Sequence, residues 1–100
     1  MSVTIPGASI PRAGDLAQVD VEGTPLTLAN VDGQIYAFDD TCTHSGCSLA
    51  DGDLDGVVVT CACHGSQFDV RTGSVMRGPA MTPVHAYAVR REGADLVVQP

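Results

Sequence analysis

Two short motifs, each combining a cysteine with a histidine, constrain this chain more than any other feature of its sequence. The first is Cys42-Thr43-His44, and the second, after sixteen intervening residues, is Cys61-Ala62-Cys63-His64. Each motif offers one sulfur and one nitrogen. This stoichiometry suits a two-iron cluster in which one iron takes two cysteines and the other takes two histidines. If each loop reaches both irons, the ligands are Cys42, His44, Cys61 and His64.

Zinc is the competing metal for these side chains, because a set of two cysteines and two histidines binds it tetrahedrally. Common zinc modules, however, pair cysteine with cysteine and histidine with histidine at short spacings. Here each motif mixes the two residue types, and a scaffold held only by disulfides would leave both histidines unexplained. The iron–sulfur interpretation is therefore preferred, and a structural zinc module without a redox role is the alternative.

The composition indicates one small domain and argues against two classes of partner. Hydrophobic residues make up 44% of the 100 residues, which is enough for a core, and with no tryptophan present the aliphatic side chains must fill it. A net charge of −7 argues against binding to nucleic acid or to anionic membrane surfaces. We expect a redox partner with a basic patch, since opposite charges speed encounter. The alternative is that the acidic charge only aids solubility.

Targeting signals are not visible in the sequence. No segment approaches the ~18 apolar residues of a membrane span. The N-terminus shows no basic region followed by an apolar run, as a secretion signal would. The sequence therefore predicts a soluble, cytoplasmic protein without a membrane anchor.

Short strands account for the local patterns along the chain, and no amphipathic run of helical length occurs. Residues 17–22 alternate between apolar and polar side chains, as in a strand with one buried face. Asp32-Gly33 is a strong signal for a two-residue hairpin turn. The β-branched run at 57–60 leads directly into Cys61, which places the ligand loops at strand ends. Further strands are predicted at 26–28, 35–38, 66–70, 84–89 and 94–99, with an extended lead-in at 1–14 and a turn-rich segment at 50–56.

The segments CTHSGCSL and CACHGSQFD resemble the two cluster-binding loops of Rieske iron–sulfur proteins. With the continuation SQFDVRTGSVMRGPA, the chain resembles a Rieske-type ferredoxin over roughly residues 15 to 100. The resemblance implies an all-β fold, a Rieske-type antiparallel β-sandwich that forms a single domain over residues 1–100. It also implies a small cluster-binding subdomain, inserted at about residues 40–82, that holds one [2Fe-2S] cluster. Gly78-Pro79-Ala80 resembles the proline loop that covers the cluster in this family.

The remaining cysteines, Cys47 and Cys63, lie one in each loop. In the respiratory branch of the Rieske family the corresponding pair forms a disulfide that joins the loops, which implies a Cys47–Cys63 bond here. Such a bond would contribute ~3 kcal/mol by the chain-entropy estimate. Because cytosolic disulfides are usually reduced, the alternatives are two free buried thiols or one of the two acting as a ligand. Many Rieske ferredoxins of oxygenase systems lack this pair.

Three further positions are informative by the same resemblance. In high-potential family members, a serine after the second motif donates a hydrogen bond to a bridging sulfide, and Ser66 matches it. A tyrosine two residues later donates to a ligand sulfur in those members, but this chain has Phe68, which implies a lower potential. Ser45 stands where several respiratory members have leucine. The other candidate side chains are interpreted as surface or packing residues: His85, Met76 and Met81.

The ligand set indicates an electron carrier rather than an enzyme. All four ligand positions are filled by the protein, which leaves no open coordination site for a substrate. By resemblance, such ferredoxins pass single electrons from a flavin reductase to the Rieske non-haem iron oxygenase of an aromatic-ring dioxygenase system. The alternative is a small Rieske subunit of an oxidoreductase complex such as nitrite reductase or arsenite oxidase. A large exposed apolar patch would favour this alternative, because permanent interfaces are more hydrophobic.

Overall fold

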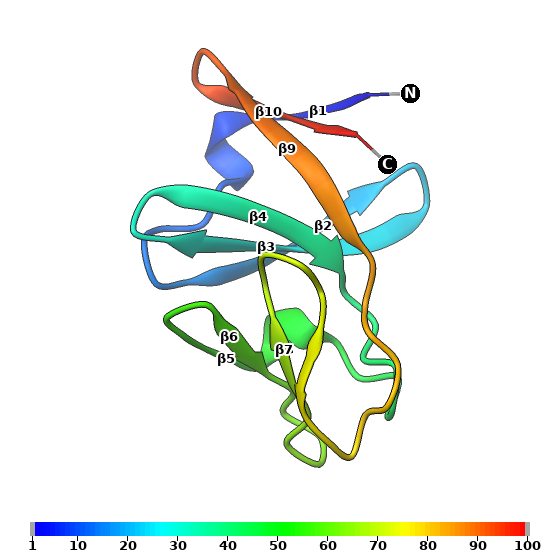
Figure 1. The fold of residues 1–100 in the computed structure, drawn as a ribbon. Helices are drawn as coiled ribbons and strands as arrows, with labels where there is room; N and C mark the ends of the chain where they lie inside the picture. Colours follow the sequence, from blue (N-terminus) through cyan, green and yellow to red (C-terminus); the bar gives the residue numbers. More distant parts are fainter. Residues whose placement is uncertain (1, 100) are drawn as a thin grey trace.

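The computed structural model describes residues 2–99, which form two antiparallel sheets (Figure 1). The first has six strands in the order β1-β10-β9-β4-β3-β2, and the second has four in the order β5-β6-β7-β8. The strands of the first are β1 (Val3–Ile5), β2 (Leu16–Val21), β3 (Thr24–Val31), β4 (Gln34–Asp39), β9 (Ala86–Glu92) and β10 (Asp95–Gln99). Those of the second are β5 (Asp53–Asp55), β6 (Val58–Thr60), β7 (Gln67–Asp69) and β8 (Val75–Arg77). The predicted all-β fold class is confirmed, and within the described residues helix is limited to the 3₁₀ turns η1 (Gly7–Ser9) and η2 (Leu49–Asp51).

The six-stranded sheet curls so that strands from its two ends share one core. Ile5 of β1 and Val98 of β10 pack in the same buried cluster as Leu26 and Leu28 of β3. Since β1 and β3 are far apart in the strand order, only a curved sheet brings them together. Strand β3 is buried on both faces over 26–30, and its two buried polar side chains, Thr27 and Asn30, both form hydrogen bonds.

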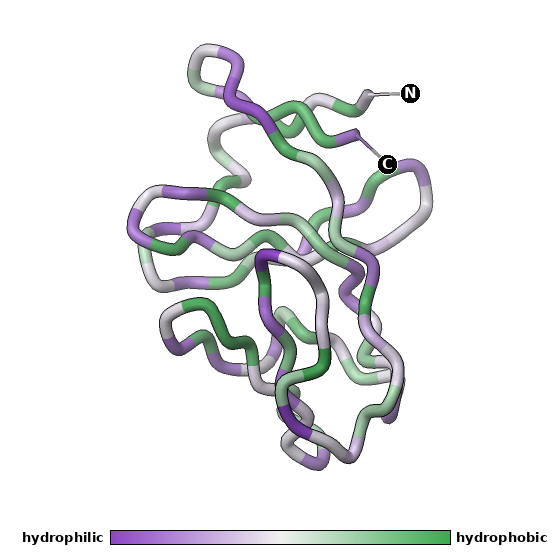
Figure 2. The backbone as a smooth tube through the Cα atoms, in the orientation of Figure 1, coloured by the Kyte–Doolittle hydropathy of each residue, from purple (hydrophilic) through white to green (hydrophobic). Residues whose placement is uncertain are grey.

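The β3–β4 hairpin forms where the sequence predicts it. Val31 pairs with Gln34, and the two turn residues between them have positive φ values of 52° for Asp32 and 93° for Gly33. This is the geometry that an Asp-Gly pair adopts at low cost in a two-residue hairpin. Figure 2 shows hydrophilic residues at such hairpin ends and hydrophobic stretches along the strands.

The four-stranded sheet lies between β4 and β9 in the sequence and packs against the larger sheet. A second buried cluster joins the two, with Phe38 of β4 against Val59 of β6 and Phe68 of β7, all without exposed surface. The strands of this smaller sheet have only three residues each, so packing rather than sheet length must hold them.

Three strands lie where the sequence analysis places none. β1 lies in the predicted lead-in and pairs with β10 at the other end of the chain, with Val3 opposite Val98. β5 lies in the segment interpreted as turn-rich, and β8 follows the β7 turn. Each is short and at a sheet edge, so partner strands rather than its own apolar pattern define it.

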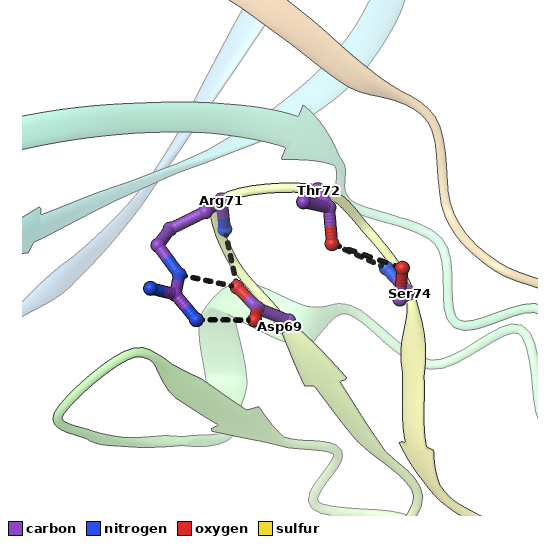
Figure 3. Close-up of polar contacts among 4 residues, drawn as sticks. All are labelled: Asp69, Arg71, Thr72 and Ser74. Atoms are coloured by element: carbon purple, nitrogen blue, oxygen red, sulfur yellow. Dashed lines mark hydrogen bonds and ion pairs between the residues drawn. The ribbon is translucent and has the colours of Figure 1, made fainter.

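The turn between β7 and β8 is built around Asp69 (Figure 3). Its Oδ1 accepts hydrogen bonds from the Arg71 backbone N–H at 2.9 Å and from Arg71 Nε at 3.1 Å, while Oδ2 accepts from Nη2 at 2.8 Å. These bonds from Arg71 hold the pKa of Asp69 below its usual value. Gly73 completes the turn by close packing, because a Cβ there would lie 1.9 Å from the Val84 carbonyl oxygen. The turn therefore holds Val84, two residues before the start of β9, and the Val84 N–H donates to the Gly73 carbonyl at 3.0 Å.

Within residues 2–99, no helix has the length and hydrophobicity needed to cross a membrane.

Candidate metal centre

The two cysteine–histidine motifs form loops of matching backbone construction. The Cys42 N–H donates to the Cys47 carbonyl at 2.9 Å, and the Cys61 N–H donates to the Ser66 carbonyl at 2.8 Å. Each loop is therefore closed by a bond from its first cysteine to the residue five positions later. The first loop follows the end of β4, and the second begins directly after β6, as the β-branched run predicts.

The loops bury their leading sulfurs and expose their imidazoles. Cys42 and Cys61 are each 1% exposed, whereas His44 and His64 are both exposed at the surface. The two imidazole rings face each other edge-on with centroids 5.6 Å apart. His64 itself has a φ of 68°, in the left-handed region that residues other than glycine rarely adopt. All four predicted ligand side chains thus lie at one end of the molecule, in two layers.

Hydrogen-bond donors surround the buried sulfurs. Burial raises the pKa of the Cys42 thiol, but hydrogen bonds from the Ser45 hydroxyl, the Ser45 and His44 amides and the Cys61 side chain outweigh this and lower it. The Ser45 hydroxyl also lies 3.5 Å from the Cys61 Sγ of the other loop. The surroundings of Cys42 therefore favour its thiolate, which is the form that binds metal.

A disulfide between Cys47 and Cys63 joins the two loops, as the family resemblance implies. Its Cα atoms are 6.3 Å apart, and it links two points that are 16 residues apart in sequence. Cys42 and Cys61 are the free cysteines. The bond therefore constrains the loop spacing and leaves the two buried sulfurs available.

We call residues 78–83 the proline loop, because they begin with Gly78-Pro79-Ala80, the segment that resembles the proline loop of the family. This loop is tied to both ligand loops. The Ser66 hydroxyl, which has no exposed surface, accepts a hydrogen bond from the Ala80 N–H at 3.0 Å. On the other side, the Thr43 hydroxyl donates to the Thr82 carbonyl at 2.6 Å. The three segments therefore form one connected unit around the buried sulfurs. Because Ser66 accepts this bond, its own hydroxyl proton stays free to be donated elsewhere.

Asp40 anchors the first loop to the larger sheet. Its carboxylate is buried and accepts hydrogen bonds from Thr27 Oγ1 at 2.7 Å, Gln18 Nε2 at 2.7 Å, Ser48 Oγ at 2.8 Å and the Ala50 N–H at 3.1 Å. Burial opposes the charge, but these four bonds hold the pKa of Asp40 below its ordinary value. The carboxylate thus connects β2 and β3 with both ends of the loop. This role is not recognisable from the sequence, in which its only signal is an acidic residue directly before the first motif.

The arrangement fits a two-iron cluster better than a single metal ion. Among residues 2–99, no group of three or more His, Cys, Asp and Glu side chains is placed to hold one ion. A mononuclear zinc site would need four ligands converging on one point. A cluster with two irons needs only two ligands for each, in two separate pairs. The buried sulfur pair and the exposed imidazole pair meet that requirement.

The end of the molecule that carries the ligands has no acidic residue, lysine or arginine in its loops. We call residues 41–48, 61–66 and 78–83 the uncharged tip. Met81 in this tip is 93% exposed. The acidic residues lie outside these segments, so the net charge of −7 belongs to the rest of the molecule.

Other candidates from the sequence have no part in this arrangement. His85 is exposed and packs edge-on against Tyr87, with ring centroids 4.5 Å apart, in agreement with its interpretation as a surface residue. Met76 is 56% exposed. Phe68 is a fully buried core residue, as its plain interpretation predicts.

Comparison with known proteins agrees with this geometry. The Rieske [2Fe-2S] domain matches residues 3–88. The biphenyl dioxygenase ferredoxin subunit of Pseudomonas sp. strain KKS102 is 42% identical over 86 residues, which cover 85% of this chain and 79% of that protein. Among solved structures, the ferredoxin of carbazole 1,9a-dioxygenase from Nocardioides aromaticivorans IC177 superposes with a TM-score of 0.92 at 27% identity, covering 99% of this chain and 97% of the other.

A third match is a chain in the complex of reduced oxygenase and oxidized ferredoxin of carbazole 1,9a-dioxygenase. It has a TM-score of 0.88 and 32% identity, covering 97% of this chain and 91% of that one. The cofactor of this domain is one [2Fe-2S] cluster, as the donor set predicts. By a match that spans most of its length, the chain belongs to the Rieske [2Fe-2S] domain family.

Proposed function

We propose that this protein is a soluble, cytoplasmic one-electron carrier that takes electrons from a flavin reductase and delivers them to a Rieske non-haem iron oxygenase of an aromatic-ring dioxygenase system. The observation that carries the proposal is the layered ligand pair, with two imidazoles exposed at an uncharged tip above two buried sulfurs. Relatives at up to 42% identity are ferredoxin components of dioxygenase systems, and one similar chain belongs to a complex of ferredoxin with oxygenase.

The ligand assignment is part of the proposal. Cys42 and Cys61 bind the inner iron as thiolates. His44 and His64 bind the outer iron through one ring nitrogen each, and Ser66 donates a hydrogen bond from its hydroxyl to the cofactor. When bound, the cluster takes up and releases one electron. We also propose that residues 1–100 are a single Rieske domain, with residues of about 40–82 as its cluster-binding subdomain.

Each part of the site contributes to electron transfer in a definite way. Two neutral imidazoles in place of two thiolates remove two negative charges from the ligand set, which favours electron uptake in a low-dielectric site. The disulfide and the hydrogen bonds to the proline loop hold the loops at fixed spacing, which limits movement between oxidation states. The exposed imidazole edges give the electron its shortest route to a partner.

The surface favours a shuttle over a permanent subunit. The large hydrophobic side chains exposed among residues 2–99 are Met76 and Met81, which is far less than a stable subunit interface requires. The disulfide is the one observation that favours the alternative, a small Rieske subunit of an oxidoreductase complex such as nitrite reductase or arsenite oxidase. A brief contact through a small interface fits the carrier role better.

The proposal is tested in two steps. First, the purified protein is analysed for iron, acid-labile sulfide and zinc, and the dithionite-reduced form is examined by EPR. We expect two irons and two sulfides per chain and the signal of a histidine-ligated cluster; bound zinc without iron would contradict the proposal. Cell fractionation checks the cytoplasmic location.

The second step tests electron delivery. The holoprotein is added to the reductase and oxygenase components of a biphenyl dioxygenase system, from which their own ferredoxin has been omitted. Dihydroxylated biphenyl should form only when the holoprotein is present. Normal reduction by the reductase without product would instead favour the subunit alternative, and the control is the same protein after chelation of its iron.

A further inference from the structure

Ser45 makes a contact between the two ligand loops that the ligand assignment does not use. It lies between His44 and Gly46 in the first loop and is half-buried. Its Oγ is 3.5 Å from Cys61 Sγ, which belongs to the second loop. This distance is within the range of a hydrogen bond to sulfur. A hydroxyl of the imidazole-bearing loop therefore touches a buried sulfur that the other loop supplies.

The direction of this hydrogen bond follows from the other groups around it. The Cys47 N–H points at Ser45 Oγ from 3.3 Å, so the serine oxygen already accepts a bond. A cysteine that ligates metal is a thiolate and has no proton to give. The proton between Ser45 and Cys61 must then come from the serine, and the contact is an O–H···S bond to a ligand sulfur.

We propose that Ser45 sets the reduction potential of this protein by donating a hydrogen bond across the loops to the Cys61 sulfur. The inference rests on the proposed function, because it requires Cys61 to be a ligand. Reduction adds negative charge to the ligand sulfurs, and a donor aimed at a sulfur interacts more strongly with the more negative state. Ser45 therefore favours the reduced form and raises the potential. The serine keeps its proton in both states, so no proton transfer accompanies this effect.

One further observation supports a role at the sulfurs. Phe68 of β7 is fully buried and has no polar atom in its side chain, so it offers the sulfurs no donor. The first loop thus supplies a side-chain donor that position 68 lacks.

The experiment measures the midpoint potential of the holoprotein and of three variants by EPR-monitored potentiometry. Ser45→Ala removes the donor, and we expect an approximately tenfold loss in the equilibrium constant for reduction, a fall of about 59 mV for one electron. Ser45→Thr keeps a hydroxyl and should restore the potential. Ser48→Ala is the matched control, since it removes the same group from the same loop but Ser48 donates to Asp40 rather than to sulfur. It should lower stability and leave the potential unchanged.

The contrary results are distinct. An unchanged potential in Ser45→Ala, or an equal fall in Ser45→Ala and Ser48→Ala, would mean that Ser45 only supports the loop. If Ser45→Ala does not retain iron, the test rests on Ser45→Gly, which also removes the hydroxyl and should lower the potential, and on Ser45→Thr, which keeps it. An unchanged potential in Ser45→Gly, or a lowered potential in Ser45→Thr, would overturn the inference. Loss of iron binding in the wild type would instead overturn the proposed function.

Discussion

The two ligand loops contribute the same residue types and close with the same backbone bond, yet different parts of the fold support them. The first loop is fastened by the buried carboxylate of Asp40 to β2 and β3 of the larger sheet. The second loop connects strands β6 and β7 of the smaller sheet, and Ser66 links it to the proline loop by a hydrogen bond. Two matching ligand loops are therefore held in place by unrelated contacts. The motifs supply the metal ligands, and these contacts bring the two loops together.

The junction between the sheets carries the difference between the loops. Asp39 and Asp40 are neighbours in sequence, but Asp39 accepts a hydrogen bond from the Tyr87 hydroxyl of β9, whereas Asp40 binds the first loop. Adjacent carboxylates thus hold the two segments that enter and leave the inserted part of the fold. We expect substitutions at these supporting residues to lower stability in part, whereas substitutions at the cysteine ligands should abolish cluster binding.

The largest effect is expected at the ligands themselves, because both loops are needed to hold the cluster. Replacing Cys42 or Cys61 by alanine should abolish the visible absorbance and the EPR signal of the purified protein, because either change leaves only one thiolate for the inner iron. Iron content per chain is the measurement. His85→Ala, at an exposed histidine outside the loops, is the control and should keep its full iron content. Retention of the cluster in either cysteine variant would refute the ligand assignment.

Asp40→Ala should weaken the first loop without removing a ligand. The change leaves several donors near the loop without an acceptor, and we expect a loss of about 3 kcal/mol in the free energy of unfolding. Asp40→Asn keeps an oxygen that can accept from Thr27 and Ser48 and should lose less than half of that. Denaturant unfolding and the rate of iron release to a chelator measure both. Equal losses in the two variants would show that the acceptor oxygen kept by asparagine does not stabilise the loop.

Ser66→Ala should affect the second loop and the proline loop together. The buried Ala80 N–H loses its acceptor, which we expect to cost about 1–2 kcal/mol in unfolding free energy. Loss of the hydroxyl donor should also lower the reduction potential, and Phe68→Tyr should raise it by adding one. The two readouts are separable: a stability loss with an unchanged potential would restrict Ser66 to holding the proline loop.

The smallest expected effect concerns the Asp39–Tyr87 contact at alkaline pH. Burial, together with the hydrogen bond to Asp39, raises the pKa of Tyr87 to about 12. The neutral phenol is therefore favoured in the folded state, so its contribution is complete below pH of about 10 and is lost as the pH rises toward 12. Tyr87→Phe should cost about 1 kcal/mol at pH 8. That difference from the wild type should shrink once the pH rises above about 10 and be lost before pH 12, as measured by unfolding at a series of pH values.

What the sequence predicts well is local, and what it misses depends on distant partners. The Cys-x-His and Cys-x-x-His motifs and the Asp32-Gly33 turn are recognisable because their chemistry lies within a few residues. The role of Asp40 is not, since its partners Gln18 and Thr27 lie 22 and 13 residues away in sequence. Likewise β1 has three residues and becomes a strand only through β10, near the other end of the chain. The Cys47–Cys63 bond is implied only by the family resemblance, because four cysteines alone permit several pairings.

The uncharged tip separates two stages of an encounter with a partner: long-range attraction by the acidic body, and direct contact at the imidazoles. In a uniformly acidic protein both stages would depend on the same charges. The acidic body can attract a basic partner over a distance of about one Debye length, ~8–10 Å at physiological salt, and added salt should slow that approach. Once the partner touches the imidazoles, no charged side chain of the three tip loops lies at the contact. Salt should then change how often the molecules meet much more than how fast the electron crosses, and release after transfer requires no ion pair within these loops to be broken.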